Sequence, residues 1–116
     1  MPESLGVLVI DGSAQYRSLI SAVLVEHGYE VVQASDASSA VEQLGKRQFS
    51  VVLLDLKMPY NGIAFIDYLS DALPLVLART IAFVPWIDRP IWGVLPKPFQ
   101  VDELVKTVAA CARRDG

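Results

Sequence analysis

Hydrophobic residues along this chain form two kinds of pattern that alternate from one end to the other. Short runs of consecutive apolar residues are typical of strands buried on both faces, whereas apolar residues three and four positions apart are typical of helices. Strand-like runs cover residues 7–10, 29–34, 49–54, 75–78 and 94–95. Helical spacing follows the first three runs and the last one. The alternation predicts an α/β fold with a parallel sheet.

Residues with strong preferences at helix ends delimit the predicted helices. Ser13 and Asp36 can cap the first two helices, and Gly28 and Gly45 stand where those helices should end. The third helix is expected over residues 63–69. The side chains expected to face the sheet are Tyr16, Leu19, Ile20, Val23, Leu24, Ala40, Val41, Leu44, Phe65, Ile66, Leu69, Val101, Leu104, Val105, Val108 and Ala112.

Residues 80–92 break the alternation, because they contain Pro85, Pro90 and both tryptophans of the chain. Two prolines leave little room for a long helix, so we expect an irregular crossover or a helix of about one turn. The connection must still cross one face of the sheet. Trp86 and Trp92 either fill the core in place of the missing helix, which we favour, or bind a partner from the surface.

Composition excludes several classes of protein. The 116 residues suffice for one domain with a single core. A net charge of −3 and scattered basic residues argue against contact with nucleic acid. The one cysteine, Cys111, cannot form an internal disulfide, and the apolar run at residues 5–10 is too short for a signal peptide or a membrane span. We therefore expect a cytoplasmic protein that contacts no membrane.

Charged residues stand where several predicted strands end. Asp11 follows the first strand-like run, Asp55 follows the third, and Lys97 lies between two prolines after the fifth. Arg79 and Thr80 follow the predicted fourth strand. Functional groups of an open parallel sheet gather outside the carboxyl ends of its strands. We expect these side chains to form one small site for an anion and a metal.

Several short motifs occur in a fixed order around these residues. They are Val9-Ile-Asp11 with Arg17, Gly28-Tyr29, Leu54-Asp55-Leu-Lys-Met58-Pro59 with Gly62, Leu73-Pro74, Lys97-Pro98-Phe99 and Glu103-Leu104. Over nearly its full length the chain thereby resembles the receiver domain of two-component response regulators. The resemblance implies a flavodoxin-like (βα)5 three-layer sandwich with strand order 2-1-3-4-5, in which the fourth helix is short or missing. It also implies that residues 1–116 are a single receiver domain without an output domain.

By the same resemblance, Asp55 is the phosphoacceptor and Lys97 contacts the phosphoryl group. Mg²⁺ would bind the Asp55 and Asp11 carboxylates and the main-chain carbonyl of Lys57. A histidine kinase, a phosphotransfer protein or a small phosphodonor would supply the phosphoryl group. The response would pass through binding of a downstream protein or of a second copy of the chain as a homodimer.

The chain departs from the family's pattern at several places around the expected site. Receivers carry two adjacent acids after the first strand, and the second is Gly12 here, so we expect weaker Mg²⁺ binding. The Thr or Ser that ends the fourth strand in the family falls on Arg79. Either Thr80 contacts the phosphate after a shift of one residue, or Arg79 fills the position, or Arg79 lies on the surface. Val94 replaces the aromatic residue of the fifth strand.

Two interpretations of function follow. One is an atypical receiver that is phosphorylated on Asp55 in a phosphorelay and signals by protein–protein interaction. The alternative is a pseudo-receiver that serves as an interaction or dimerisation module without phosphate, and Gly12 and the irregular crossover favour it. An aspartyl phosphatase would need an acid where Lys57 stands, and no Gly-x-Gly-x-x-Gly follows the first strand. We therefore expect no enzyme.

Overall fold

Strands and helices alternate along the chain, as its hydrophobic pattern predicts. The computed structural model describes residues 5–57 and 62–114. Its strands are β1 (Gly6–Ile10), β2 (Glu30–Ala34), β3 (Val51–Leu54), β4 (Thr80–Ala82) and β5 (Gly93–Val94). Its helices are α1 (Ala14–Glu26), α2 (Ala37–Lys46), α3 (Gly62–Ala72), α4 (Pro74–Leu77) and α5 (Val101–Ala112). No helix in the two described ranges is long and apolar enough to cross a bilayer.

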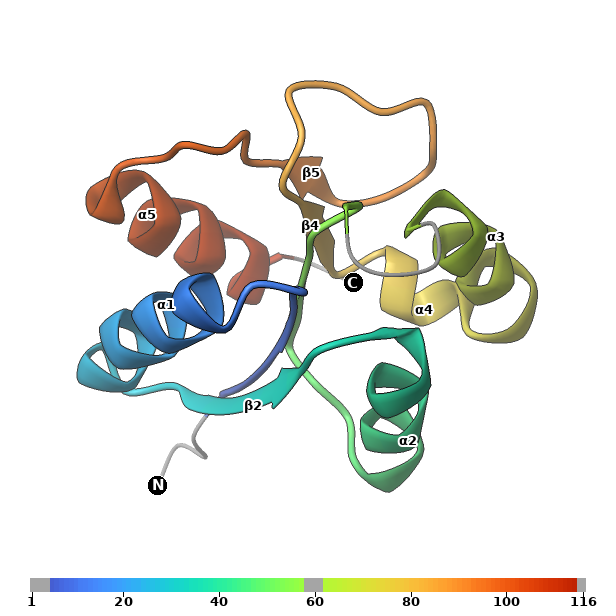
Figure 1. Ribbon diagram of the computed structural model, residues 1–116, viewed down its shortest axis with the longest axis horizontal. Helices are drawn as coiled ribbons and strands as arrows, with labels where there is room; N and C mark the ends of the chain where they lie inside the picture. Colours follow the sequence, from blue (N-terminus) through green and yellow to red (C-terminus); the bar gives the residue numbers. More distant parts are fainter. Residues whose placement is uncertain (1–4, 58–61, 115–116) are drawn as a thin grey trace.

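The five strands form one parallel sheet in the order β2-β1-β3-β4-β5. Helices α1 and α5 cover one face of this sheet, and α2, α3 and α4 cover the other (Figure 1). The strand order and the three layers confirm the predicted flavodoxin-like fold.

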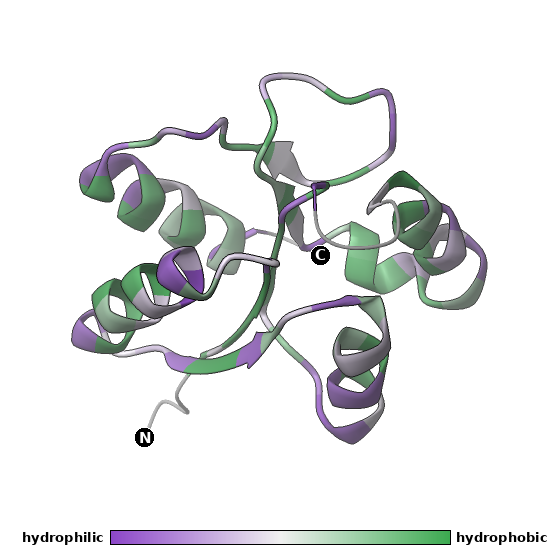
Figure 2. Ribbon diagram, viewed as in Figure 1, coloured by the Kyte–Doolittle hydropathy of each residue, from purple (hydrophilic) through white to green (hydrophobic). Residues whose placement is uncertain are grey.

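Side chains of the central strands are buried on both faces of the sheet. In β1, Val7 and Val9 belong to the core on the side of α1 and α5, while Leu8 and Ile10 belong to the core on the side of α2 and α3. All four are fully buried, and Figure 2 shows hydrophobic residues along the central strands. Burial on two faces explains why these strands are continuous apolar runs in the sequence.

Local hydrogen bonds set the ends of the first two helices. The Ser13 Oγ accepts a hydrogen bond from the Tyr16 N–H (3.2 Å), and the Asp36 Oδ1 accepts one from the Ser39 N–H (2.8 Å). The donors of Ser39 hold the pKa of the Asp36 carboxyl below its ordinary value. Gly28, with φ of +91°, follows α1 in the left-handed conformation that suits glycine. The predicted caps at Ser13 and Asp36 and the predicted end of α1 at Gly28 are therefore confirmed, whereas α2 continues past Gly45 to Lys46.

The predicted inward faces of the helices are wrong at two positions. Leu19 is 48% exposed and Val101 is 46% exposed. The fully buried residues of α1 are Ile20 and Leu24, because the contact with the sheet is narrower than the apolar stripe of the helix. Val101 is the first residue of α5, ahead of the buried positions of that helix.

The fourth strand begins five residues later than predicted. Residues Pro74–Leu77 form helix α4, and β4 spans Thr80–Ala82. Periodicity does not distinguish a short strand from a short buried helix, and Pro74 in the first turn favours the helix. Leu77 is buried in the same core cluster as residues of α2 and α3. The prediction of a strand at residues 75–78 is therefore wrong.

The crossover from β4 to β5 is irregular. Residues 83–92 contain no helix, which confirms the prediction that the helix between the last two strands is missing (Figure 1). The Trp92 N–H donates to the Thr80 carbonyl (3.0 Å), and the Trp92 side chain packs against the core beside α1 and α5. Trp86 is 76% exposed. One tryptophan thus fills the core, and the other faces solvent.

Gly62, the first residue of α3, lies directly against the backbone of Leu56. Its N–H donates to the Leu56 carbonyl (3.2 Å), and a Cβ at Gly62 would lie 2.6 Å from the Leu56 Cα. We expect Gly62→Ala to lower the free energy of unfolding by about 1–3 kcal/mol, because two backbone segments must move apart. Urea denaturation measures this loss.

Gly45→Ala is the matched control for that variant. A Cβ at Gly45, inside α2, would meet no atom within 4 Å. Alanine is also the better helix former, so Gly45→Ala should be neutral or stabilising. Equal stability of the two variants would contradict the close contact between Gly62 and Leu56.

Candidate functional site

Asp11 and Asp55 follow neighbouring strands at the same edge of the sheet. Ile10 of β1 pairs with Leu54 of β3, so the next residues of the two strands lie side by side. The Asp11 N–H donates to the Ala34 carbonyl (3.1 Å), and the Asp55 N–H donates to the Ile10 carbonyl (2.9 Å). The register of the sheet therefore places the two carboxylates next to each other.

The Lys97 ammonium lies between these carboxylates. Its Nζ is 2.6 Å from the Asp11 Oδ2 and 3.3 Å from the Asp55 Oδ2. The Ser13 N–H donates to the Asp11 Oδ1 (2.8 Å), and the Lys57 N–H donates to the Asp55 Oδ1 (3.0 Å). The Asp11 side chain is fully buried, whereas 12% of the Asp55 side chain and 19% of the Lys97 side chain are exposed. Each carboxylate oxygen thus has a donor, as poorly solvated charges require.

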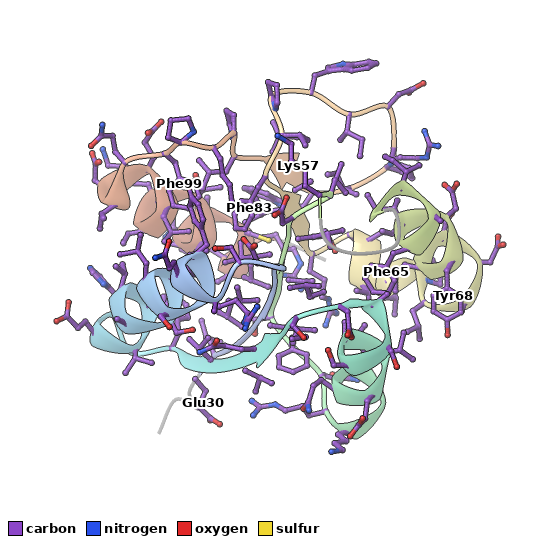
Figure 3. The ribbon with its side chains drawn as sticks, in the orientation of Figure 1. Glu30, Lys57, Phe65, Tyr68, Phe83 and Phe99 are labelled. Atoms are coloured by element: carbon purple, nitrogen blue, oxygen red, sulfur yellow. The ribbon has the colours of Figure 1, made fainter. Side chains whose placement is uncertain are left out.

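Aromatic rings also contact the Lys97 ammonium. Its Nζ is 3.7 Å from the centroid of the Tyr16 ring and 5.2 Å from that of the Phe83 ring. Phe99 contacts both rings, at centroid distances of 6.0 Å and 5.4 Å, and Phe83 and Phe99 lie side by side in Figure 3. A cation over the face of an aromatic ring is attracted by the ring's charge distribution. The ammonium is therefore held by two carboxylates and two rings.

Phe83 is the residue that follows β4 at this edge. Its N–H donates to the Leu54 carbonyl (2.9 Å), which precedes Asp55. Phe83 is absent from the predicted site because the fourth strand was expected at residues 75–78. The apolar run at residues 81–84, just after Thr80, was the signal that could have located both the strand and its end.

Thr80 and Arg79 lie away from this site. Thr80 pairs with Val52, so it lies roughly 10 Å along the strands from the carboxylates, and its Oγ1 donates to a carbonyl of α4 (2.7 Å). Arg79 precedes β4, and its Nη1 donates to the Phe49 carbonyl (3.0 Å) ahead of β3. The prediction that either residue contacts the phosphate is corrected, because Thr80 begins the strand that it was expected to end.

A model of the response regulator receiver domain matches residues 7–109 of the chain. The chain belongs to this family. Phosphorylation on an aspartate in two-component signalling is a property of the family, whose members interact with histidine kinases or phosphotransfer proteins. The family therefore agrees with the fold and with an acid at the end of β3.

Relatives and solved structures support the same assignment. The chain is 30% identical over 118 residues to the phosphate regulon transcriptional regulatory protein PhoB of Escherichia coli, covering 93% of this chain and 52% of PhoB. It is 30% identical over 121 residues to the CAI-1 autoinducer sensor kinase/phosphatase CqsS of Vibrio cholerae, covering 90% of this chain and 17% of CqsS. The chain thus spans about half, or less, of the length of these relatives.

The receiver fold is also found among solved structures. The chemotaxis response regulator CheY4 of Vibrio cholerae matches with a TM-score of 0.82 and 26% identity, over 94% of this chain and 99% of CheY4. The receiver domain of NtrX from Brucella abortus matches with a TM-score of 0.82 and 24% identity, over 94% of this chain and 99% of that domain. The second match shows the fold alone.

Receiver domains typically bind Mg²⁺, and the acids of this receiver could supply some of the ligands that such a cation needs. Asp11 and Asp55 converge on the Lys97 ammonium, so the pair already holds one positive charge. Within residues 5–57 and 62–114, no three His, Cys, Asp or Glu side chains form a group that could hold a metal ion. Gly12 supplies no third acid. A bound Mg²⁺ would therefore share its ligands with Lys97 and keep several waters.

Met58 and Pro59, which carry part of the resemblance, lie outside the described residues.

We expect Lys97→Met to lower the free energy of unfolding of this receiver by more than about 1 kcal/mol. The variant leaves two poorly solvated carboxylates without the cation that lies between them. Breaking a fully buried ion pair costs about 3–5 kcal/mol, and the partial exposure of Lys97 reduces that loss. Chemical denaturation at neutral pH measures it.

Lys46→Met is the matched control, because it removes the same charge from the surface of α2. Lys46 pairs with Glu42 at 3.1 Å, and an exposed pair of this kind contributes about 0.3–0.5 kcal/mol. If Lys97→Met and Lys46→Met lose the same stability, the pairing of Lys97 with two carboxylates has no energetic importance.

Proposed function

We propose that this receiver accepts a phosphoryl group on Asp55 in the cytoplasm, from a histidine kinase or a phosphotransfer protein, and signals by binding another protein. The observation that carries the proposal is the unequal burial of the two acids. The Asp11 side chain is fully buried, whereas 12% of the Asp55 side chain is exposed and its Oδ2 lies 3.3 Å from the Lys97 Nζ. A phosphodonor can therefore reach Asp55 and not Asp11.

The chemistry assigns a role to each charged residue of the site. An Asp55 carboxylate oxygen would form a bond to phosphorus while the bond from phosphorus to the donor atom breaks in line. The Lys97 ammonium would contact the transferred phosphoryl group and offset its charge. Asp11, Asp55 and the main-chain carbonyl of Lys57 would hold Mg²⁺, which when bound offsets more of that charge. To contact the phosphoryl group, the Lys97 ammonium must loosen its contact with Asp11.

A second candidate function is a pseudo-receiver that binds a partner or a second copy without phosphate. Phe83 supports it, since the residue that follows β4 offers no hydroxyl to a phosphoryl oxygen. Lys97 supports it too, because the two acids are already neutralised in part by an ammonium that aromatic rings hold in place. Gly12 removes one expected metal ligand. In this alternative, the site is a structural ion pair.

The crossover of residues 83–92 is the surface that we assign to a protein partner or to a second copy of the chain. Trp86 is 76% exposed at this crossover. Ile87 and Ile91 pack against the core beside α2 and α3, and Trp92 packs against the core on the other face. Neighbouring residues thus fix the crossover against the core while the Trp86 side chain is exposed. Tryptophan is often among the residues that contribute most of the binding energy of an interface.

Beryllofluoride, a phosphoryl analogue, separates the two candidate functions. With Mg²⁺ present, it should give saturable NMR shifts at residues 54–57 of the wild type, with a midpoint at millimolar Mg²⁺ because one acid is missing. Asp55→Asn is the control and should show none. A wild type without any saturable change would refute phosphorylation on Asp55 and leave the pseudo-receiver.

The Trp86 surface is tested by sedimentation equilibrium of the purified chain. If two copies meet through this crossover, Trp86→Ala should raise the dimer dissociation constant at least tenfold, roughly the loss expected at the centre of an interface. Tyr68→Ala is the control, since Tyr68 of α3 is also aromatic and is 46% exposed. Identical sedimentation of the wild type and Trp86→Ala would rule out this homodimer.

A further inference from the structure

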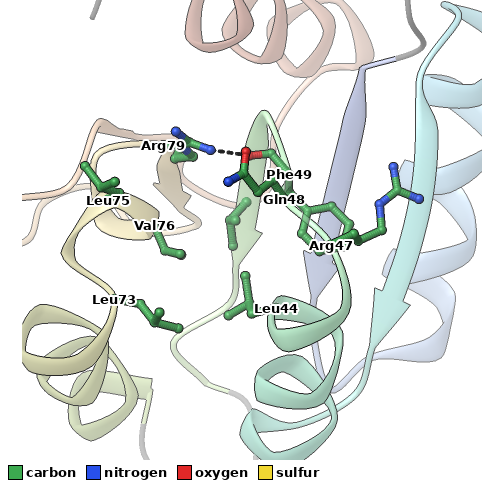
Figure 4. A pocket seen from close by; sticks show the side chains of 9 residues that line it. Leu44, Arg47, Gln48, Phe49, Leu73, Leu75, Val76 and Arg79 are labelled. Carbon is green, nitrogen blue, oxygen red and sulfur yellow. Dashed lines mark hydrogen bonds between the residues drawn. The ribbon is translucent and has the colours of Figure 1, made fainter.

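A cavity of about 230 Å³ lies toward the amino ends of β3 and β4, away from the edge that carries the aspartates. It opens between the end of α2 and helix α4 (Figure 4). Phe49 and Val52 are buried core residues at its base, and Leu44, Leu73 and Val76 line its sides. The interior of this cavity is therefore mainly apolar.

The volume of the cavity limits what it can hold. A water molecule takes about 30 Å³ of the liquid, so the cavity has room for roughly eight waters, or for a ligand of roughly eight non-hydrogen atoms. Such a ligand is smaller than those of most small-molecule sites. Leu75, which also lines the cavity, is 72% exposed and offers further apolar surface to a ligand.

Arg79 places a positive charge at one end of this cavity (Figure 4). Its Nη1 donates to the Phe49 carbonyl (3.0 Å), and in the described part of the chain no acidic side chain pairs with it. Arg47 also lines the cavity, but it is paired with Glu30 at 3.1 Å. Among the residues that the structure describes, the half-buried Arg79 guanidinium is thus a charge without a counterion, which favours binding of an anion.

Arg114 adds a second positive charge nearby. Its Nη1 donates to the carbonyls of Ser50 (2.6 Å) and Cys111 (2.8 Å). The Cys111 Sγ donates to the Arg79 carbonyl (3.6 Å), so Arg79 and Arg114 both contact Cys111. Two arginines without acidic partners among the described residues create a positive potential at this edge of a chain whose net charge is −3.

We propose that this cavity binds a small organic monoanion, a carboxylate with an apolar tail of about five carbon atoms. The carboxylate lies against the Arg79 guanidinium, and the tail packs among Leu44, Leu73 and Val76. The proposal concerns a site that the phosphoryl chemistry of Asp55 does not use, so it stands or falls independently of that function.

Three probes of the purified chain separate charge from apolar contact. Hexanoate carries both a carboxylate and a tail, hexanamide carries the tail without the charge, and acetate carries the charge without the tail. In NMR titrations we expect hexanoate to give saturable amide shifts at residues 73–79. Hexanamide and acetate should each bind at least tenfold more weakly.

Variants locate the site. Arg79→Gln should weaken hexanoate binding at least tenfold, and Val76→Phe should abolish it by filling the cavity while the circular dichroism spectrum stays that of the wild type. Arg113→Gln is the matched control, because it removes the same charge from an exposed position and should leave binding unchanged. If Arg79→Gln fails to fold, the comparison of hexanoate with hexanamide and the Val76→Phe variant still decide the question.

Several results would overturn the proposal. Equal binding of hexanoate and hexanamide would mean an apolar cavity without anion recognition. Hexanoate binding that survives Arg79→Gln or Val76→Phe would place the ligand elsewhere. Shifts at residues 73–79 that depend on protein concentration without any probe would mean that a second copy occupies the cavity. No saturable shift up to the solubility limit of hexanoate would exclude the site.

Discussion

The Lys97 ammonium between Asp11 and Asp55 is the interaction on which the carboxyl edge of the sheet depends. The register of β1 and β3 places two carboxylates next to each other in a poorly solvated place, where they would repel each other. Lys97 lies 86 positions from Asp11 and 42 from Asp55 in the sequence, yet it contacts both. Its charge offsets the cost of placing two carboxylates side by side with little contact with water.

This arrangement connects stability with the proposed chemistry. The charge that would stabilise a phosphoryl group already neutralises the acids of the resting site, and the Tyr16 and Phe83 rings hold it there. Phosphorylation of Asp55 would therefore compete with contacts that stabilise the fold. Phe83, which has no hydroxyl, also removes one way in which a phosphoryl group could act on the end of β4. Lys97 and Phe83 are thus compatible both with a receiver that is phosphorylated and with a pseudo-receiver that acts without phosphate.

The two edges of the sheet differ in how their charges are balanced. At the carboxyl edge, both acids are paired with a lysine, whereas at the amino edge Arg79 and Arg114 donate to backbone carbonyls and have no acidic partner in the described ranges. Helix α4 contributes to this difference. Because residues 74–77 form a helix before β4, the side chains of Leu75 and Val76 line the cavity beside Arg79.

The hydrophobic pattern by itself determined the alternation of strands and helices, and the caps at Ser13 and Asp36 set two helix ends, because these features depend on neighbouring residues. The parallel sheet then implied that Asp11, Asp55 and Lys97 gather at one edge. Only the tertiary structure decided where β4 begins. Residues 75–78 and 81–84 are both short apolar runs, and they differ only in that the first packs against the core and the second pairs with β3. From that choice follow the contact of the Phe83 ring with Lys97 and the charge of Arg79, which has no acidic partner in the described ranges. Such contacts depend on which side chains meet across the fold, and no local pattern carries that information.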